Sequence, residues 1–312
     1  MMSTHANSVS RIAVVGVGQV GGAVAYALIL GSVAKELLLV DIKADLKDSQ
    51  VRDLSDVAYS GNSSTRVRSA TYKEAGQCDI VVVTAGSKYS PGETSMQHIY
   101  RNIAILQSAV GAMKPFNPNT ILLVVANPVD LLSSLALDIS GLPASQVLGS
   151  GTFIDSVRLR GLVAEKVGVA ASSIDLYVLG LHGEHQVAAW STATVGGVAL
   201  DKSVPTNTLN YAALADECRH KSQSIFRVKG ATPYGVGAAV SSLCSSILLD
   251  KRNVRPVSHF QPDFGCCFSL PVVLGREGIL KTIHMPLEKD EWARISESAT
   301  TLRDMLARIR EG

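Results

Sequence analysis

Short continuous apolar runs, rather than strict alternation, mark the strand candidates in the first half of the chain. They are "RIAVV" (11–15), "ELLLVD" (36–41), "RVRSAT" (66–71), "DIVVVT" (79–84), "TILLVV" (120–125) and "QVLGS" (146–150). Such runs are typical of strands that are covered on both faces of a sheet. Segments with helical character lie between them, for example "VGGAVAYALILG" at 20–31. This alternation predicts an α/β fold with a parallel, doubly wound sheet over residues 1–148.

The second half of the chain has a mixed pattern. Helices are predicted from about residue 155, over about 211–227 and over about 232–250, and runs such as "DLYVLG" and "CCFSLPVVLGREGIL" indicate strands. Near the C-terminus, one helical face carries the apolar residues Trp292, Ile295, Leu302, Met305, Leu306 and Ile309. Residues 149–312 are therefore predicted to form a second domain of the α+β type.

The composition excludes several classes of protein. Charged residues make up 18% of the 312-residue chain and the net charge is +2, whereas a nucleic-acid-binding protein needs clustered Lys and Arg. No apolar run approaches the length of a membrane span, and the polar N-terminal "MMSTHANSVSR" lacks the apolar core of a signal peptide. The five cysteines show neither an even pairing nor the spacing of a metal site. This pattern favours buried reduced thiols, no bound metal and a cytoplasmic location.

A glycine motif follows the first predicted strand. In "GVGQVG", Gly16, Gly18 and Gly21 permit a tight turn, the approach of backbone to a pyrophosphate, and close packing of helix and strand. Asp41 ends the second predicted strand, twenty residues beyond Gly21, and its carboxylate can accept hydrogen bonds from a ribose 2′-OH. The motif predicts a Rossmann domain that binds NAD in preference to NADP. The structural alternative is a glycine turn with a solvated aspartate.

Four polar residues are candidates for the chemistry beside this site. Asn127 ends a predicted strand, while Asp155 and Arg158 share one face of a predicted helix. An arginine can bind a carboxylate through two hydrogen bonds, and an aspartate can orient a histidine such as His182 and raise its pKa. Each residue also has a structural alternative when it is considered alone. Asn127 could form a turn, Asp155 and Arg158 could form a surface ion pair, and His182 could be a structural histidine. Beside an NAD site the histidine, aspartate and arginine have a clear joint use.

The order and spacing of seven motifs resemble those of the L-lactate/malate dehydrogenase family over nearly the whole chain. They are "GVGQVG" with Asp41, "TAG" (84–86), "PGET" (91–94), "NPVD" (127–130), "DSVRLR" (155–160), "HG" (182–183) and "VKGAT" (228–232). The resemblance implies NAD as cofactor and hydride transfer between nicotinamide and C2 of a 2-hydroxy or 2-keto acid. It also implies a substrate domain at 149–312 and a homo-oligomer, either a tetramer or a dimer.

The resemblance implies a role for each matching residue. His182 exchanges a proton with the substrate oxygen, Asp155 holds its imidazole, and Arg158 binds the substrate carboxylate. Asn127 positions the substrate oxygen and the nicotinamide. The remaining implied contacts are to the substrate side chain, from Thr232, and to the cofactor, from Gln19, Val20, Thr84, Ala85, Gly86 and Val236.

The loop "SKYSPGETSMQHIYRN" (87–102) corresponds to the lid that closes over the substrate in this family. Ser95 stands directly after "PGET", where the family has an arginine that polarises the substrate carbonyl. Tyr89 stands where lactate dehydrogenases commonly have glutamine and malate dehydrogenases have arginine. Lys88 could substitute in part for the missing cation, although a solvated loop lysine is favoured. Both Ser95 and Tyr89 are predicted to contact the substrate.

Three interpretations of this departure remain open. The first is an L-2-hydroxy acid dehydrogenase that is lactate-like in class, and the second is an enzyme that reduces another carbonyl or an imine. The third is an NAD-binding family member that has lost most of its catalysis. The intact set of His182, Asp155 and Arg158 favours an enzyme, whereas Ser95 favours the other two interpretations. Because Tyr89 removes the cation that the second carboxylate of malate would need, activity on malate is expected to be negligible.

Overall fold

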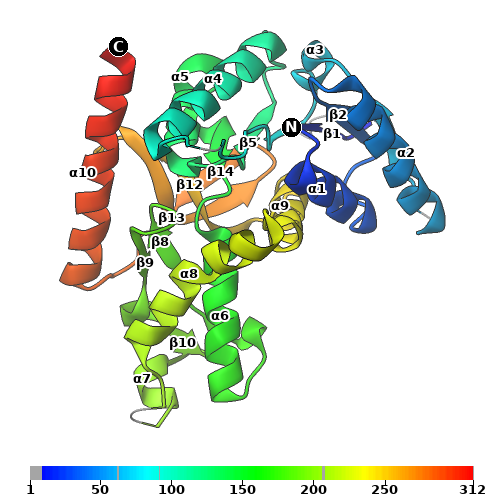
Figure 1. The fold of residues 1–312 in the computed structure, drawn as a ribbon. Coiled ribbons are helices and arrows are strands. Elements are labelled where there is room, and N and C mark those ends of the chain that lie inside the picture. The colour runs from blue at the N-terminus through cyan, green and yellow to red at the C-terminus, as the bar shows by residue number, and fades with distance from the viewer. Residues whose placement is uncertain (1–8, 62, 91, 206–207, 312) are drawn as a thin grey trace, which may run out of the picture.

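The N-terminal half of the molecule is built on a parallel sheet. The computed structural model describes residues 9–61, 63–90, 92–205 and 208–311, so most of the polar N-terminal segment lies outside the described residues. The strands run in the order β3-β2-β1-β4-β5-β6 (Figure 1). Their bounds are β1 (Arg11–Val15), β2 (Glu36–Val40), β3 (Arg66–Ser69), β4 (Ile80–Val83), β5 (Ile121–Val124) and β6 (Val147–Gly149). Every predicted strand of this half is confirmed, most of them shorter by one or two residues.

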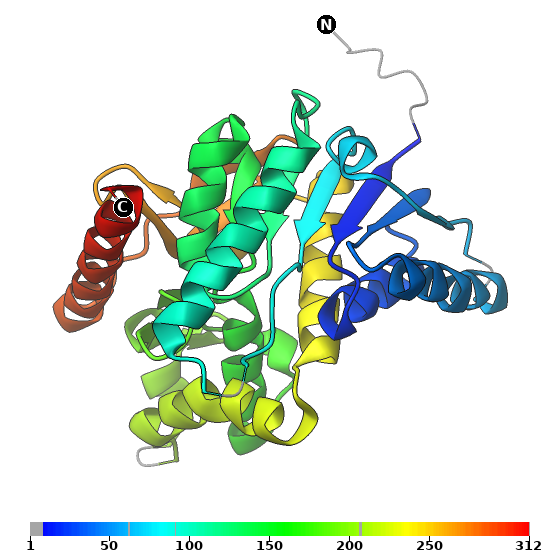
Figure 2. The ribbon, with the colours of Figure 1, turned by 45° about the horizontal axis from the view of Figure 1, so that its top comes forward.

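Helices cover both faces of this sheet, which explains why apolar residues occupy successive strand positions. On one face, Ala13 and Val15 of β1 belong to the core that includes α4 (Ser95–Met113) and α5 (Val129–Ser140). On the other face, Ile12 and Val14 belong to the core that includes α1 (Gln19–Leu30) and α9 (Pro233–Leu248) (Figure 2). This half also contains α2 (Ala44–Ser60) and α3 (Tyr72–Ala75). A strand between two helical layers has no polar face, and the predicted doubly wound arrangement is confirmed.

The sheet continues into the second half of the chain through antiparallel strands. β12 (Asn253–Gln261) pairs with β6 between Ser258 and Gly149. Beyond it lie β13 (Cys266–Gly275), β8 (Val178–Gly180) and β9 (Gln186–Ala188), with β14 (Gly278–Thr282) beside β13. A separate small sheet contains β7 (Ile174–Asp175), β10 (Thr194–Val195) and β11 (Val198–Ala199). The mixture of antiparallel strands and helices confirms the predicted class of this half, although the sequence pattern does not single out β12.

The remaining helices pack around these antiparallel strands. They are α6 (Phe153–Val167), α7 (Leu200–Ser203), α8 (Tyr211–Lys229) and α10 (Lys289–Glu311), with 3-10 turns at 144–146, 171–173 and 190–192. In α10, Ile295 and Leu306 are buried as predicted from the apolar face. Trp292, in the first turn of the helix, is 41% exposed and meets Phe264 edge-on, with ring centroids 6.3 Å apart.

The cysteines and the helices carry further information on the class of protein. All five cysteines lie within the described residues, and each is a buried free thiol. Burial raises the pKa of Cys244 to about 12, which keeps this thiol protonated.

Across the described ranges, no helix is both long enough and apolar enough to cross a membrane. The same residues contain no group of three or more His, Cys, Asp or Glu side chains that could hold a metal ion.

Candidate active site

The turn between β1 and α1 is shaped by its glycines. Gly16 has a left-handed φ of +93°, and a side chain there would press against the backbone of Ala85, just after β4. A Cβ on Gly21 would collide with the carbonyl oxygen of Gly16. Gly18 has open space where its Cβ would lie, so a phosphate can approach the backbone at the N-terminus of α1. The three glycines therefore fit the predicted dinucleotide.

Asp41 is held in a fixed position at the end of β2. Its Oδ2 accepts the backbone N–H of Val17 at 2.8 Å, and its Oδ1 accepts the backbone N–H of Lys43 at 2.9 Å. Each carboxylate oxygen keeps a lone pair for a ribose hydroxyl. Because Val17 belongs to the glycine turn, the same hydrogen bond ties the carboxylate to the backbone that would bind phosphate.

A cleft of about 1440 Å³ joins the dinucleotide turn to the second half of the chain. Residues predicted for the cofactor and the substrate line it together: Gly16, Gly18, Gln19, Val20, Gly21, Asp41, Thr84, Ala85, Gly86, Tyr89, Asn127, Arg158, His182, Thr232 and Val236. The cleft lies at the carboxyl ends of β1, β2, β4 and β5, where doubly wound sheets usually bind their ligands. Two other predicted residues, Asp155 and Ser95, are not among the described residues that line it.

His182 and Asp155 form a hydrogen-bonded pair at this cleft. Nδ1 of His182 lies 2.6 Å from Oδ2 of Asp155, whose side chain is 2% exposed. Because an ionised carboxylate only accepts hydrogen bonds, Nδ1 carries the proton and Nε2 is left for the substrate. Burial lowers the pKa of His182, but the charge and hydrogen bond of Asp155 outweigh this effect and the net pKa is raised. The pair can therefore hold a proton at the cleft and exchange it with a bound oxygen.

A second carboxylate fixes the loop that carries His182. Oδ2 of Asp130, in α5, accepts the backbone N–H of His182 at 2.8 Å. Burial raises the pKa of Asp130 to about 6. Although Asp130 belongs to the "NPVD" motif, the sequence gives no sign of this contact, since the two residues are 52 positions apart. Asp130 is therefore a positioning residue that sequence reasoning missed.

Arg158 projects from α6 on the same side as Asp155. Its Nη1 lies 3.2 Å from Oδ1 of Asp155 and also donates to Oγ of Ser222, in α8. Arg158 lines the cleft, so its other guanidinium nitrogens can bind a substrate carboxylate. Sequence reasoning missed Ser222. Ser222 lies within the helix predicted over about 211–227, but no motif in the sequence marked it as a partner of Arg158.

Two family models match nearly all of the chain. The NAD binding domain of lactate/malate dehydrogenases matches residues 10–149, and their α/β C-terminal domain matches residues 152–311. The chain belongs to the lactate/malate dehydrogenase family. Its N-terminal part is accordingly the NAD binding domain of that family, and NAD is the cofactor.

Individual members of the lactate/malate dehydrogenase family agree with this assignment. L-lactate dehydrogenase A of Rhizopus oryzae is 40% identical over 296 residues, which cover 95% of this chain and 92% of the relative. L-lactate dehydrogenase of Synechococcus sp. (strain JA-3-3Ab) is 35% identical over 302 residues, with coverage of 95% and 98%. The crystal structure of minor L-lactate dehydrogenase from Enterococcus mundtii has a TM-score of 0.92 at 32% identity, covering 96% of this chain and 98% of that one. The predicted family and fold are confirmed.

In this family member, Asp41 is expected to select NADH over NADPH. The 2′-phosphate of NADPH would face the Asp41 carboxylate, and the two negative charges repel each other. We expect the Kd for NADH, measured by fluorescence titration, to be at least about tenfold lower than the Kd for NADPH. The variant Asp41→Ala should narrow the difference between the two constants. Equal dissociation constants in the parent protein would contradict the prediction.

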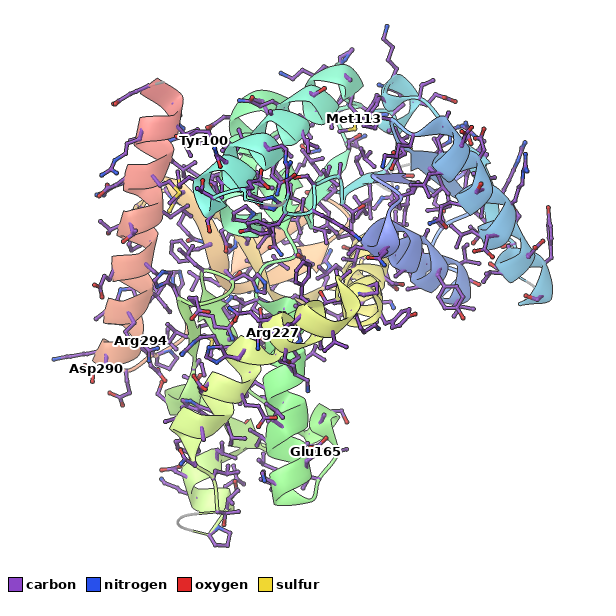
Figure 3. The ribbon with its side chains drawn as sticks, in the orientation of Figure 1. Tyr100, Met113, Glu165, Arg227, Asp290 and Arg294 are labelled. Atoms are coloured by element: carbon purple, nitrogen blue, oxygen red, sulfur yellow. The ribbon has the colours of Figure 1, made fainter. Side chains whose placement is uncertain are left out.

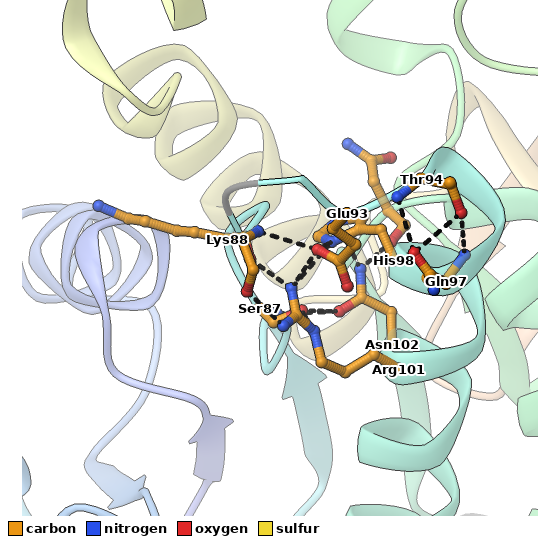
Figure 4. Close-up of polar contacts among 10 residues, drawn as sticks. Ser87, Lys88, Glu93, Thr94, Gln97, His98, Arg101 and Asn102 are labelled. Atoms are coloured by element: carbon orange, nitrogen blue, oxygen red, sulfur yellow. Dashed lines mark hydrogen bonds and ion pairs between the residues drawn. The ribbon is translucent and has the colours of Figure 1, made fainter.

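Arg101 organises the loop at 87–102, which corresponds to the lid of this family (Figure 4). Its guanidinium donates to Oγ of Ser87 at 2.9 Å and to Oγ of Ser90 at 2.7 Å. It also donates, at 2.6 Å each, to the carbonyl oxygen of Lys88 and to Oε2 of Glu93. The side chain of Lys88 itself is exposed and extends away from the other labelled residues. Arg101 therefore holds the lid together through contacts within the lid.

Ser95 and Tyr89, the two lid residues that depart in type from the family pattern, have different surroundings from each other. Ser95 is the first residue of α4, whose N-terminus is capped by the Thr94 hydroxyl, which accepts the backbone N–H of Gln97 at 3.2 Å. Ser95 is exposed and lies outside the group of described residues that line the cleft. Tyr89 lines the cleft and stacks on His98, with ring centroids 3.9 Å apart. At this position the lid brings an aromatic ring, rather than a cation, to the cleft.

Proposed function

We propose that this protein is an NAD-dependent dehydrogenase of an L-2-hydroxy acid, lactate-like in class. The observation that carries the proposal is the His182–Asp155 pair, 2.6 Å apart, at the same cleft as Arg158 and the dinucleotide turn. Reduction of a 2-keto acid requires a proton donor, an anchor for the carboxylate and a hydride carrier. Relatives named L-lactate dehydrogenase, at 40% and 35% identity, support the same substrate class.

Each side chain at the reaction centre has a task. The guanidinium of Arg158 binds the substrate carboxylate, and the side-chain amide of Asn127 positions the substrate oxygen. His182 donates a proton from Nε2 to that oxygen during reduction and removes it during oxidation. Asp155 keeps the imidazole in the required tautomer and stabilises its protonated form. NAD, held by the glycine turn and Asp41, would supply the nicotinamide that carries the hydride.

The surroundings of the reaction centre complete the proposed site. Thr232 borders the substrate side chain, and Val236 borders the nicotinamide; both residues line the cleft. Tyr89 and Ser95 belong to the lid that covers the substrate. Ser95 supplies no positive charge to the substrate oxygen as negative charge develops there, so turnover is expected to be slow for this family.

Two other hypotheses have less support. An enzyme for another carbonyl or an imine, and an NAD-binding protein without catalysis, both rest on Ser95 and Tyr89. The complete set of His182, Asp155 and Arg158 favours catalysis on an acid substrate. The similarity to L-lactate dehydrogenases extends over 95% of the chain, which favours the first hypothesis.

A panel of 2-keto acids with NADH, followed by the loss of nicotinamide absorbance, tests the proposal. We expect monocarboxylic 2-keto acids to be reduced and oxaloacetate to be reduced more slowly. Tyr89 offers no cation to the second carboxylate of oxaloacetate, and burying an unpaired charge is costly. Faster turnover of oxaloacetate than of every monocarboxylic acid would contradict the lactate-like class. The absence of any turnover, while NADH still binds, would contradict the dehydrogenase function.

We expect the protein to form a homo-oligomer, with a tetramer slightly ahead of a dimer. The family resemblance supports this expectation. Sedimentation at micromolar concentration should give the mass of two or four chains. A monomer under these conditions would contradict the prediction.

The wider context of the activity follows from the same resemblance. The substrate is a small 2-keto or 2-hydroxy acid, and neither a nucleic acid nor a membrane is an expected partner. A cytoplasmic location is consistent with five buried free thiols. The NAD-binding domain comprises residues 1–148 and the substrate domain comprises residues 149–312.

A further inference from the structure

One face of α8 forms a wall of the cleft. Ser222, Gln223, Phe226 and Arg227 of α8 line the cleft, as does Gly230, which caps its C-terminus. The spacing of the four helical residues matches a single face of a helix. Ser222 contacts the guanidinium of the arginine that is placed to bind the substrate carboxylate. The rest of this face therefore lines the cleft beside the guanidinium of Arg158.

Phe226 stands on this wall one helical turn after Ser222. Its side chain is 48% exposed although it lines a cleft. Contact between this ring and an apolar group of a ligand would remove apolar surface from water, which is favourable. Aromatic groups are well suited to such contact, since they add stacked or edge-to-face interactions.

Tyr89 presents a second ring from the lid. It is 54% exposed, and one face of its ring is stacked on His98 with 13° between the ring planes. Nε2 of His98 lies 3.1 Å from Nδ2 of Asn102, which donates to the carbonyl oxygen of Asn127 at 3.1 Å. These contacts fix the Tyr89 ring relative to the reaction centre. Stacking on His98 leaves the opposite face of the Tyr89 ring for a ligand.

Small residues follow this wall of the cleft. Gly230 and Ala231 line the cleft directly before Thr232. Among the described residues, apart from the neighbouring chain itself, no atom lies within 4 Å of the place where a Cβ on Gly230 would stand. The left-handed φ of +70° at Gly230 also disfavours a larger residue there. No side chain therefore narrows the cleft at this point.

We propose that the preferred substrate of this protein is a 2-keto or 2-hydroxy acid with a large aromatic side chain, held between Tyr89 and Phe226. The assignment deepens the dehydrogenase function proposed above and depends on it. Arg158, with Ser222 beside it, binds the carboxylate, and His182 serves the oxygen at C2. The aromatic group then lies against the rings of the lid and of α8. Pyruvate has only a methyl group at this position and leaves both rings in contact with water.

Initial rates with NADH test the assignment by comparing phenylpyruvate with pyruvate, 2-ketoisocaproate and oxaloacetate. We expect kcat/KM for phenylpyruvate to exceed that for pyruvate by at least about tenfold, which is within the range that apolar pockets provide. Tyr89→Gln removes the ring of the lid, and Phe226→Ala removes the ring of α8. Each variant should lower the ratio of the two kcat/KM values by about tenfold.

Tyr100→Gln is the matched control for Tyr89→Gln. Tyr100 is 51% exposed, lies on α4 away from α8 (Figure 3), and is not among the described residues that line the cleft. This variant should keep the phenylpyruvate-to-pyruvate ratio of the parent protein. A loss of preference in the control as large as that in Tyr89→Gln would overturn the proposed contact with the Tyr89 ring.

The outcomes separate this assignment from the dehydrogenase function. A parent enzyme that prefers pyruvate, 2-ketoisocaproate or oxaloacetate overturns the aromatic assignment, whereas turnover of any 2-keto acid upholds the dehydrogenase. An unchanged ratio in both ring variants, with the folded state verified by circular dichroism, also overturns the assignment. If a variant does not fold, the binding of phenyllactate and lactate to the NAD-loaded parent decides the question, and equal affinities overturn the assignment. The absence of turnover on every acid rejects the dehydrogenase function and this inference together.

Discussion

Replacement of His182 by alanine is expected to lower kcat/KM for 2-keto acid reduction by about 10²–10⁴. Nδ1 of His182 is occupied by Asp155 at 2.6 Å, so Nε2 is the atom placed to protonate the substrate oxygen. Steady-state rates with NADH measure the effect, and a parallel titration with NADH verifies that the cofactor still binds. The matched control is His185→Ala, three residues further along, where the side chain is exposed. The control should retain the parent rate, and a His182→Ala variant that also retained it would contradict the assigned role.

The dependence of the rate on pH extends this prediction to Asp155. Burial lowers the pKa of His182, but Asp155 raises it more strongly, so the net pKa lies above the ordinary value. Reduction requires the protonated imidazole and should therefore decline as the pH rises through this raised pKa. Asp155→Asn removes the negative charge. This variant should have a lower kcat, and its rate should decline at a lower pH than that of the parent protein. If the midpoint of the decline were the same in the parent and in Asp155→Asn, the proposed coupling between the two residues would be wrong.

Replacement of Ser95 by arginine is expected to raise turnover of a 2-keto acid by about ten- to a thousandfold, mainly in kcat. In the family pattern, an arginine at this position polarises the substrate carbonyl. A donor of this kind acts most strongly as charge develops on the oxygen, and losing one costs roughly 3–4 kcal/mol. Ser95 is exposed at the start of α4, so the larger side chain does not disturb the core. Rates at saturating 2-keto acid measure the gain.

Two control variants test whether the gain depends on the position of the new charge and on His182. Met96→Arg adds the same charge at the next residue, which is also exposed, and should give no comparable gain. His182→Ala should abolish activity in the Ser95→Arg background as well. If Ser95→Arg lowered activity on the best substrate, the lid would be suited to another reaction. If neither version turned over any 2-keto acid while NADH still bound, Tyr89 or the rest of the lid would block the site.

The sequence by itself determined the architecture of the first half and the cofactor. Runs such as 11–15 and 79–84 predict strands because a strand between two helical layers is apolar on both faces. Gly16, Gly18 and Gly21 predict the phosphate turn from their spacing directly after a strand. Asp41 follows at the spacing of a ribose-binding carboxylate. These features depend on local periodicity and local backbone geometry, so they can be predicted from residues that are close together in the sequence.

The reaction centre was predictable only in part. The motif order identified His182, Asp155 and Arg158, and the structure brings the three together at the cleft. It also shows Ser95 exposed and outside the described lining of the cleft, whereas Tyr89 lies within that lining. The sequence shows which residue types occupy the lid, but the direction in which each side chain points depends on how the lid folds.

Only the tertiary structure decided how distant segments meet. Asp130 accepts the backbone N–H of His182 across 52 positions, and Arg158 donates to Ser222 across 64 positions. The strand β12, absent from the sequence prediction, joins the second half of the chain to the parallel sheet at β6. The stacking of Tyr89 on His98 likewise depends on the path of the lid around Arg101. The periodicity of apolar residues predicts which residues are buried. These contacts depend instead on how whole elements pack against one another, and no local sequence pattern predicts that packing.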